Sequence, residues 1–313
     1  MNDFYNGLIN AMEEAGFYIQ GDIDINKSEF QRFKSRIGGK NPDIFVKIQG
    51  NCDGATFGDW HDCESWMTWW AKNPKEFSIN DRRERQLKIE EERRKLLVKQ
   101  NILIKKCNRF FSKISTVGAS QHVYVLRKEI FPYYAKCFRK TLAIPVRDVD
   151  YELKSLQFIK TNGFKKFKHG APIKGNMIWL SEHLDKDYDG VIRICEGWST
   201  GCTIRDITKS PVICALNANN MVDVAVQLRR KYVHAALKIC ADNDQWGKEN
   251  TGMKYAFEAS HLTGATVYWP DFHNLDLSYV TPKPTDFNDL CKLAGSNLVK
   301  KNLIAIKKHS SFK

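Results

Sequence analysis

The pattern of apolar and polar positions divides the chain into stretches of different periodicity. Residues 29–33 and 43–48 alternate between polar and apolar side chains, which is typical of half-buried strands. Glycines interrupt this part of the chain where turns are expected, at Gly50, Gly54 and Gly58. The pattern therefore predicts a small antiparallel sheet inside a mixed α+β region that covers residues 1–78.

Four tryptophans follow the predicted strands closely, at Trp60, Trp66, Trp69 and Trp70. Because aromatic side chains are mainly core material, one interpretation is that these rings cap the small core. The alternative is a platform on which the bases of a single-stranded nucleic acid stack. The sequence leaves both interpretations open.

The next stretch, residues 79–118, is rich in Lys, Arg, Glu and Leu, and contains no Gly or Pro between Arg82 and Lys106. Asn80 and Asp81 can cap a helix, and these residue types favour one. The apolar positions form only a thin stripe along it. The sequence predicts a charged connecting helix, either fully solvated or facing a nucleic acid.

Residues 119–185 return to a strand-like pattern between His122 and Trp179. Residues 141–150 predict a strand that enters a turn, and residues 153–159 predict the returning strand. Lysines without an intervening acid follow in a glycine-containing stretch, at Lys165, Lys166, Lys168 and Lys174. Lysines on such a hairpin can approach phosphates closely, although a solvated loop rim is the alternative.

The last third of the chain alternates between predicted strands and predicted helices. Strands are expected at residues 190–195, 211–216, 236–241 and 265–269. Helices are expected from Ser199 onward and at residues 219–232 and 250–261. This alternation is typical of a parallel α/β sheet with right-handed crossovers.

Acidic residues follow two of these strands at their carboxyl ends. Glu196 ends the first strand, and Asp242 and Asp244 end the third. Ligands of open parallel sheets bind at this edge, and neighbouring carboxylates repel unless a cation lies between them. Hard oxygen ligands suit Mg²⁺, whereas the alternative is that the two aspartates cap the next helix.

Charge and cysteine content narrow the class of protein. The 313 residues carry 49 Lys+Arg against 36 Asp+Glu, a net charge of +13, which suits a polyanionic partner. The nine cysteines show no zinc-binding spacing and no signal segment precedes them, so we expect reduced thiols, no zinc and a cytoplasmic location. No apolar run is long enough for a membrane helix, so no membrane partner is expected.

Residues 191–197 together with 241–244 resemble the Toprim domain shared by bacterial-type primases, topoisomerases and some nucleases. More narrowly, the chain is similar to the Toprim primases of plasmids and phages over about residues 30–295. The stretches that carry this resemblance are 156–159 with Gly163 and Lys165, 196–201, 219–220, 242–244, 250–252 and 285–290, with 30–33 and 57–60 similar to the family's N-terminal region. Unlike the broader family, these residues contain neither a zinc-ribbon spacing nor a GxxxxGK[ST] phosphate loop.

The resemblance implies an architecture and a set of metal ligands. It implies a basic primase-core subdomain at residues 119–185, a Toprim domain at 186–295 and a basic tail at 296–313. Glu196 would act as a general acid or base or help to hold the metal, and Asp242 and Asp244 would bind Mg²⁺, with Mn²⁺ as an alternative. Asp286 and Asp289 would add further ligands, although Asp286 could equally start a helix.

The resemblance also implies a reaction and partners. The implied function is a DNA primase that makes short primers on single-stranded DNA from nucleoside triphosphates for a mobile element, with a separate replicative helicase. Triphosphate or template contacts would come from Lys128, Arg147, Lys165, Lys166 and Lys174. The alternatives are a Toprim nuclease and a non-enzymatic single-stranded DNA-binding protein.

Overall fold

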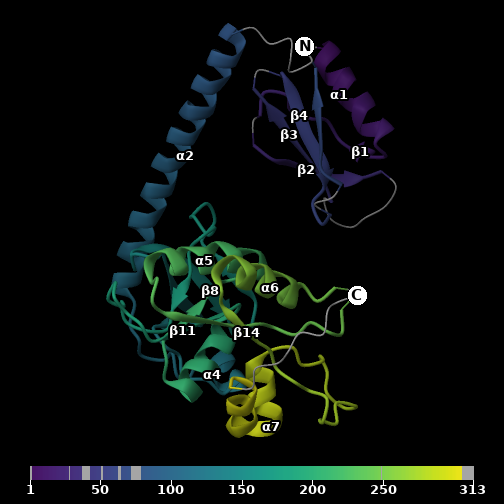
Figure 1. Cartoon of the computed structure of the whole chain (residues 1–313). Coiled ribbons are helices and arrows are strands. Elements are labelled where there is room, and N and C mark those ends of the chain that lie inside the picture. Colours follow the sequence, from purple (N-terminus) through teal and green to yellow (C-terminus); the bar gives the residue numbers. More distant parts are fainter. Residues whose placement is uncertain are drawn as a thin grey trace. The chain divides into compact units, whose positions relative to one another are not determined.

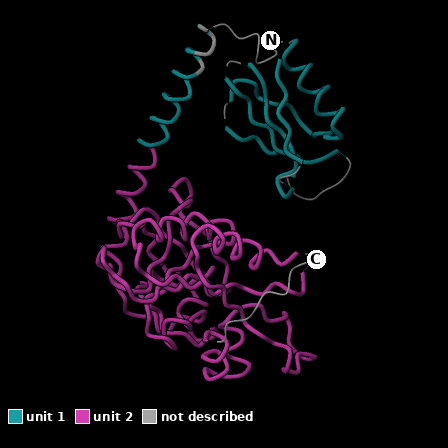
Figure 2. Tube along the Cα trace, in the orientation of Figure 1, with its two compact units in different colours: residues 1–98 teal, residues 99–313 magenta. Residues whose placement is uncertain are grey.

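The computed structural model describes residues 2–27, 29–36, 43–50, 52–62, 65–71, 79–247 and 249–304. The chain forms two compact units, unit 1 (residues 1–98) and unit 2 (residues 99–313), which Figure 2 distinguishes by colour. Unit 1 carries 15 Lys+Arg against 17 Asp+Glu, a net charge of −2, and unit 2 carries 34 against 19, a net charge of +15. The basic excess of the chain therefore lies entirely in unit 2.

Unit 1 packs helix α1 (Asn2–Glu14) against an antiparallel sheet whose strands run in the order β1-β2-β3-β4-β5. The strands are β1 (Ile19–Gln20), β2 (Gln31–Ser35), β3 (Ile44–Gln49), β4 (Gly54–Asp59) and β5 (Met67–Trp70). The predicted small antiparallel sheet is confirmed. The mixed α+β prediction for residues 1–78 places no helix at α1, although Phe4, Leu8 and Met12 form the i, i+4, i+8 stripe that buries it.

The tryptophans of unit 1 divide between the two faces of this sheet. Trp69 packs on the core with its ring 5.3 Å from that of Phe4, so the capping interpretation holds for it. Trp60 and Trp66 instead cluster around Phe45, at ring distances of 5.7 and 4.8 Å, and are 39% and 43% exposed. Base stacking on these two rings stays a prediction.

Helix α2 (Ile79–Lys113) runs for 35 residues and crosses the boundary between the units, as Figure 2 shows. The prediction of a charged helix in residues 79–118 is confirmed, and the helix starts at the predicted residue but ends at Lys113. Its apolar residues before the boundary stay exposed, with Leu87 63% and Leu96 53% accessible. The described helices include none that combines the length and the apolar character needed to cross a bilayer.

The first half of unit 2 is an antiparallel sheet in the order β6-β7-β8-β9. Its strands are β6 (Lys136–Phe138), β7 (Thr141–Arg147), β8 (Leu153–Lys160) and β9 (Lys165–Phe167). The predicted strand and its returning partner are confirmed as β7 and β8, with Leu142 opposite Ile159.

The strand-like interpretation is wrong for helix α3 (Val123–Lys128). The Nδ1 atom of His122 accepts a hydrogen bond from the Tyr124 backbone N–H at 3.2 Å and caps the start of the helix. Glu129 ends it in the left-handed conformation, at φ 54°. These local hydrogen bonds decide the structure of a segment whose apolar pattern is too short to distinguish a helix from a strand.

The second half of unit 2 contains the predicted parallel sheet. Its strands are β10 (Ile178–Trp179), β11 (Val191–Cys195), β12 (Val212–Cys214), β13 (Ala236–Cys240) and β14 (Thr266–Tyr268). They lie in the order β10-β12-β11-β13-β14, and only β10 pairs antiparallel. The helices are α4 (Trp198–Thr208), α5 (Ala218–Lys231), α6 (Thr251–Thr263) and α7 (Phe287–Asn302).

Helices cover both faces of this sheet, as predicted (Figure 1). Ile192, Ile194 and Ile239 point into the core beneath α5 and α6. Cys195, Cys214 and Cys240 point to the other face, where α4, α7 and the β6–β9 sheet pack. Helix α4 lies close to the strands because Gly201 has no side chain, since a Cβ atom there would overlap Cys214 Sγ.

We expect Ile239→Ala in β13 to lower the free energy of unfolding of unit 2 by about 2–5 kcal/mol, because the side chain is completely buried between β13 and its helices. Urea unfolding followed by circular dichroism measures the loss. Val233→Ala is the matched control, because Val233 is 58% exposed and should change stability by less than about 0.5 kcal/mol. Equal effects of the two substitutions would contradict the described core.

Candidate active site

The three predicted acids lie at the carboxyl edge of the parallel sheet. Glu196 directly follows β11, and Asp242 and Asp244 follow the neighbouring strand β13. Burial raises the pKa of Glu196, and the charges of Asp244 and Asp286 raise it further. Burial also raises the pKa of Asp242 well above its ordinary value, with contributions from Asp286, Glu196 and Asp244. The four carboxyl groups therefore lie close enough to repel one another.

The carboxyl group of Asp242 has an unsatisfied hydrogen-bonding capacity. Its Oδ1 atom is buried and has no hydrogen-bond partner among the residues that the structure describes. A buried carboxylate oxygen without a donor is costly, and a bound cation is one physical way to satisfy it. The position is therefore unfavourable for the protein alone and suited to a positively charged ligand.

The loop that starts α6 holds Asp244 in position. The Asp244 Oδ2 atom accepts a hydrogen bond from the Gly252 backbone N–H at 3.2 Å, and Asn250 Oδ1 accepts one from the Asp244 N–H at 3.0 Å. A Cβ atom at Gly252 would lie 2.5 Å from the Asp242 carbonyl oxygen, so this close approach requires glycine. Residues 250–252 belong to the stretches that carry the family resemblance, and only the structure shows that they position Asp244.

The acidic group also contains Asp286, which is the N-cap of α7. Its Oδ1 atom accepts a hydrogen bond from the Asp289 N–H at 2.8 Å, and its Oδ2 atom accepts one from Thr200 Oγ1 at 2.9 Å. Burial raises the pKa of Asp286, and the Asp289 charge adds to the increase. The predicted helix start is therefore confirmed, and the same carboxyl group faces the other acids. No local pattern in the sequence predicts Thr200 as the partner of Asp286, because the two residues lie 86 positions apart.

Lys128 lies beside Asp289, with 3.1 Å between Nζ and Oδ1. Burial disfavours its charged form, but the carboxylates of Asp286 and Asp289 outweigh this effect and raise the pKa of Lys128. The ion pair joins the end of α3 to the start of α7. Lys128 thus supports the acidic group from the side, and its Nζ is engaged with a carboxylate in this structure.

The adjacent residues Lys165 and Lys166 face opposite sides of the β6–β9 sheet. The positive charge of Lys165 lowers the pKa of both Glu196 and Asp242, and its Nζ lies 5.8 Å from the centre of the Tyr124 ring. Lys166 pairs across the strands with Phe158, whose side chain lies on the outer face. Lys165 is therefore near the acids, whereas Lys166 points away from them.

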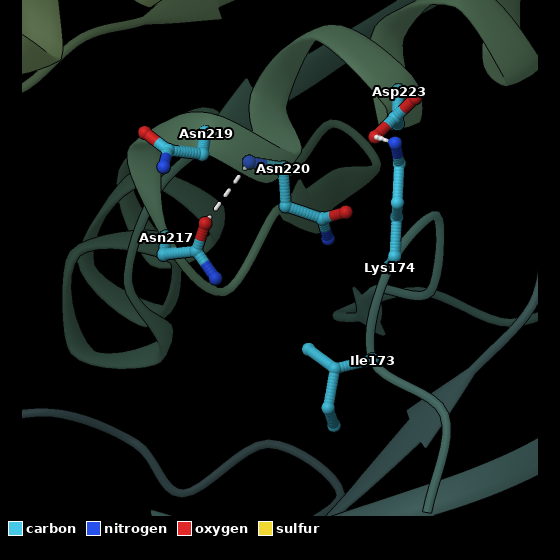
Figure 3. Close-up of a pocket in the computed structure, with 6 residues that line it drawn as sticks. All are labelled: Ile173, Lys174, Asn217, Asn219, Asn220 and Asp223. Atoms are coloured by element: carbon cyan, nitrogen blue, oxygen red, sulfur yellow. Dashed lines mark hydrogen bonds and ion pairs between the residues drawn. The ribbon is translucent and has the colours of Figure 1, made fainter. Parts of the chain in front are cut away.

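The other two predicted cations are engaged elsewhere. Arg147 Nη1 donates a hydrogen bond to the Tyr151 carbonyl oxygen at 2.8 Å, and its guanidinium carbon lies 4.4 Å from the centre of that ring. Lys174 forms an ion pair with Asp223 at 3.6 Å beside a cavity of ≈ 350 Å³ (Figure 3). Among the described contacts, none joins Arg147 or Lys174 to the acids at the sheet edge.

The acids fit a cation that brings most of its own ligands. Within the described ranges, no three His, Cys, Asp or Glu side chains converge as a ready-made metal site. Mg²⁺ needs no such cage, because it keeps several waters and takes one or two carboxylates together with phosphate oxygens. Hard oxygen donors, mutual repulsion and the unpartnered Asp242 Oδ1 atom all suit this ion.

Comparison with known families confirms the resemblance to the Toprim domain over about a third of the chain. Residues 191–297 match the family model of the Toprim domain. The mixed α/β fold class, with a C-terminal Toprim domain built around a parallel sheet, is thereby confirmed. The match includes Glu196, Asp242, Asp244, Asp286 and Asp289.

Several solved structures resemble the chain at low identity. The primase fragment of the bacteriophage T7 primase-helicase protein is 14% identical, with 58% of this chain and 69% of that chain covered and a TM-score of 0.39. The DnaG primase catalytic domain bound to single-stranded DNA is 9% identical, with coverages of 66% and 82% and a TM-score of 0.44. The zinc-binding and RNA polymerase domains of the Aquifex aeolicus primase are 11% identical, with coverages of 96% and 84% and a TM-score of 0.40.

We expect Asp242→Asn to raise the melting temperature of the protein in EDTA at pH 8. Folding raises the pKa of Asp242, so its contribution to stability is fully present below the unfolded-state pKa, where the carboxyl group is protonated. That contribution is lost as the pH rises through the folded-state pKa and the buried group ionises. Asparagine keeps the shape without the charge, so the advantage of the variant should shrink as the pH falls toward 4. Differential scanning calorimetry at both pH values, and at pH 8 with added Mg²⁺, measures this.

The matched control is Asp223→Asn, because Asp223 pairs with Lys174 at the surface, outside the acidic group. Mg²⁺ should raise the melting temperature of the wild type and of this control, and it should do so much less for Asp242→Asn. A metal-free wild type that is more stable than Asp242→Asn at pH 8 would contradict the described repulsion.

Proposed function

We propose that this protein is a primase that joins nucleotides from nucleoside triphosphates into short primers on a single-stranded DNA template. The observation that carries the proposal is the group of buried carboxyl groups at the carboxyl edge of β11 and β13, with the ammonium of Lys165 facing them. The Toprim match over residues 191–297 supports it. In the proposed reaction a 3′-hydroxyl oxygen bonds to an α-phosphorus, and the α–β phosphoanhydride bond breaks to release pyrophosphate.

In this proposal Asp242 and Asp244 hold Mg²⁺ or Mn²⁺, and Glu196 assists them. A bound divalent ion would neutralise triphosphate oxygens and increase the acidity of the attacking hydroxyl. Glu196 accepts the proton of that hydroxyl, and its raised pKa makes its carboxylate a stronger base at neutral pH. Lys165 stabilises the negative charge on the triphosphate opposite the acids.

The remaining predicted residues take supporting roles in the proposal. Asp286 orders the acidic group through its hydrogen bond with Thr200, and Lys128 fixes Asp289 next to it. Asp286 and Asp289 are candidates for further metal ligation. Arg147 and Lys174 are proposed as template contacts away from the reacting atoms, which agrees with their positions at the end of β7 and beside α5.

The proposed partners are single-stranded DNA, nucleoside triphosphates and a separate replicative helicase in the replication of a mobile element. The net charge of +15 on unit 2 supports a polyanionic template. The helicase and the mobile element rest on the sequence resemblance alone.

The test is an extension assay on single-stranded DNA with labelled ribonucleotides or deoxyribonucleotides and either Mg²⁺ or Mn²⁺. We expect template-dependent products from the wild type and a loss of at least about 100-fold in rate for Asp242→Ala and Glu196→Gln, because each removes a charge from the reacting centre. Folding of both variants is verified by circular dichroism. EDTA should abolish synthesis by the wild type.

Asp206→Ala is the matched control, because Asp206 lies on the exposed side of α4 and pairs with Lys209. It should retain synthesis within about twofold. Full synthesis by folded Asp242→Ala would refute the proposal. Shortening of the DNA in the absence of nucleotides would instead support the nuclease alternative, and metal-independent binding without any product would support the binding-protein alternative.

A further inference from the structure

The outer face of the β6–β9 sheet carries two adjoining cavities that the catalytic proposal does not use. One has a volume of ≈ 400 Å³ and the other ≈ 240 Å³. Phe110 of α2, Phe158 of β8 and Lys166 of β9 line both of them, so the cavities form one continuous groove. We call this the outer groove, and all the residues that line it belong to unit 2.

Aromatic rings form the walls of the outer groove. The Phe110 ring packs edge-on against Phe138 and Phe158, with ring centres 5.4 and 6.1 Å apart. Phe138 is 44% exposed although it lies in a strand. Rings arranged in this way offer flat surfaces to which bases can stack, and such stacking tolerates any base sequence.

Lysines border both cavities, at Lys106, Lys160, Lys166 and Lys168. No acidic residue is among the groove's described lining, and none of these four lysines forms an ion pair with another described residue. The charge is spread along the groove, since Lys106 and Lys168 lie at the larger cavity, Lys160 at the smaller one and Lys166 between them. This distribution matches a ligand with one phosphate for each base better than a single triphosphate.

The outer groove is separate from the acidic group. Successive side chains of a strand point to opposite faces. On β9, Lys165 acts on Glu196 and Asp242, whereas Lys166 lines the groove on the other side of the sheet. A ligand bound in the outer groove therefore lies on the opposite face of the β6–β9 sheet from the acidic group.

From this arrangement we propose that the outer groove binds a single strand of DNA, with successive bases stacked on Phe110, Phe138 and Phe158 and phosphates paired with the bordering lysines. That the bound strand is DNA rests on the proposed function. The binding site itself rests on the rings and lysines that line the outer groove. Such a site holds template at a distance from the point of synthesis. The chain's own residues 305–313 are a poor alternative occupant, because they carry three lysines and no acid.

The test measures the anisotropy of a fluorescein-labelled oligothymidylate with the full chain in EDTA and without nucleotides, over a range of salt concentrations. We expect Phe138→Ala to raise the Kd by about 5- to 150-fold, the range found when a stacked ring is removed. We expect Lys106→Glu with Lys166→Glu to raise it at least about tenfold at low salt. The double variant should also reduce the steepness of the salt dependence by about 0.7 for each lysine.

The control variants make the same kinds of substitution at exposed residues that do not line the outer groove. Tyr279→Ala removes a ring that is 77% exposed, and Lys186→Glu with Lys254→Glu reverses two exposed lysines. Both controls should bind within about twofold of wild type. Unchanged binding by Phe138→Ala and by the groove double variant would overturn the inference. Displacement of the oligonucleotide from wild type, but not from Phe138→Ala, by millimolar dTTP would also overturn it, since the occupant would then be a free nucleotide.

The same assay separates this inference from the proposed function. Asp242→Ala should bind the oligonucleotide without loss, because Asp242 does not line the groove. Failure of synthesis with groove-dependent binding intact would therefore count against the catalytic proposal alone. Normal synthesis with groove-independent binding would count against the outer groove alone.

Discussion

Repulsion among buried carboxyl groups is the constraint on which the carboxyl edge of the parallel sheet in unit 2 depends. Glu196, Asp242 and Asp286 each have a raised pKa, because burial removes water and neighbouring negative charges oppose ionisation. Charges placed in this way destabilise the fold unless the surrounding structure holds them. Asp286 is held by hydrogen bonds from Thr200 and from the Asp289 N–H at the start of α7, and Asp244 by one from the Gly252 N–H at the start of α6. Asp242 Oδ1 has no hydrogen-bond donor among the described residues.

This arrangement depends on close packing between elements distant in the sequence. Gly201 lets α4 lie directly on β12, and Gly252 lets the start of α6 approach the Asp242 backbone. Lys128 then joins α3 to α7 through Asp289. A side chain at either glycine would push apart the elements that position the acids. A larger residue there would therefore disturb the geometry of the acidic group as well as the packing of the core.

The distribution of charge gives the two halves of the chain different physical characters. Unit 1 is nearly neutral and exposes aromatic rings, with the Arg32 guanidinium carbon 4.7 Å from the centre of the Trp60 ring. Unit 2 carries the whole basic excess, and its cations occupy both faces of the β6–β9 sheet. A single figure for net charge could not show that Lys165 serves the acidic group while Lys166 belongs to a separate groove.

The sequence by itself determined the parallel sheet, the β7–β8 hairpin, the charged helix and the placement of Glu196, Asp242 and Asp244 at strand ends. These features follow from periodicity over a few residues, and local sequence encodes such periodicity directly. Helix α3 was not predicted, because six residues are too few for periodicity to distinguish a helix from a strand. The hydrogen bond that caps its start at His122 favours the helix.

Only the tertiary structure decided which of the candidate residues lie together. The packing brings Asp286 to the other acids, where Thr200, 86 residues away, donates a hydrogen bond to it. Arg147 instead donates a hydrogen bond to the Tyr151 carbonyl oxygen. The adjacent residues Lys165 and Lys166 lie on opposite faces of the β6–β9 sheet. The tail lysines Lys307, Lys308 and Lys313 lie outside the described residues. Contacts between distant segments depend on how whole elements pack, and no local pattern in the chain records that packing.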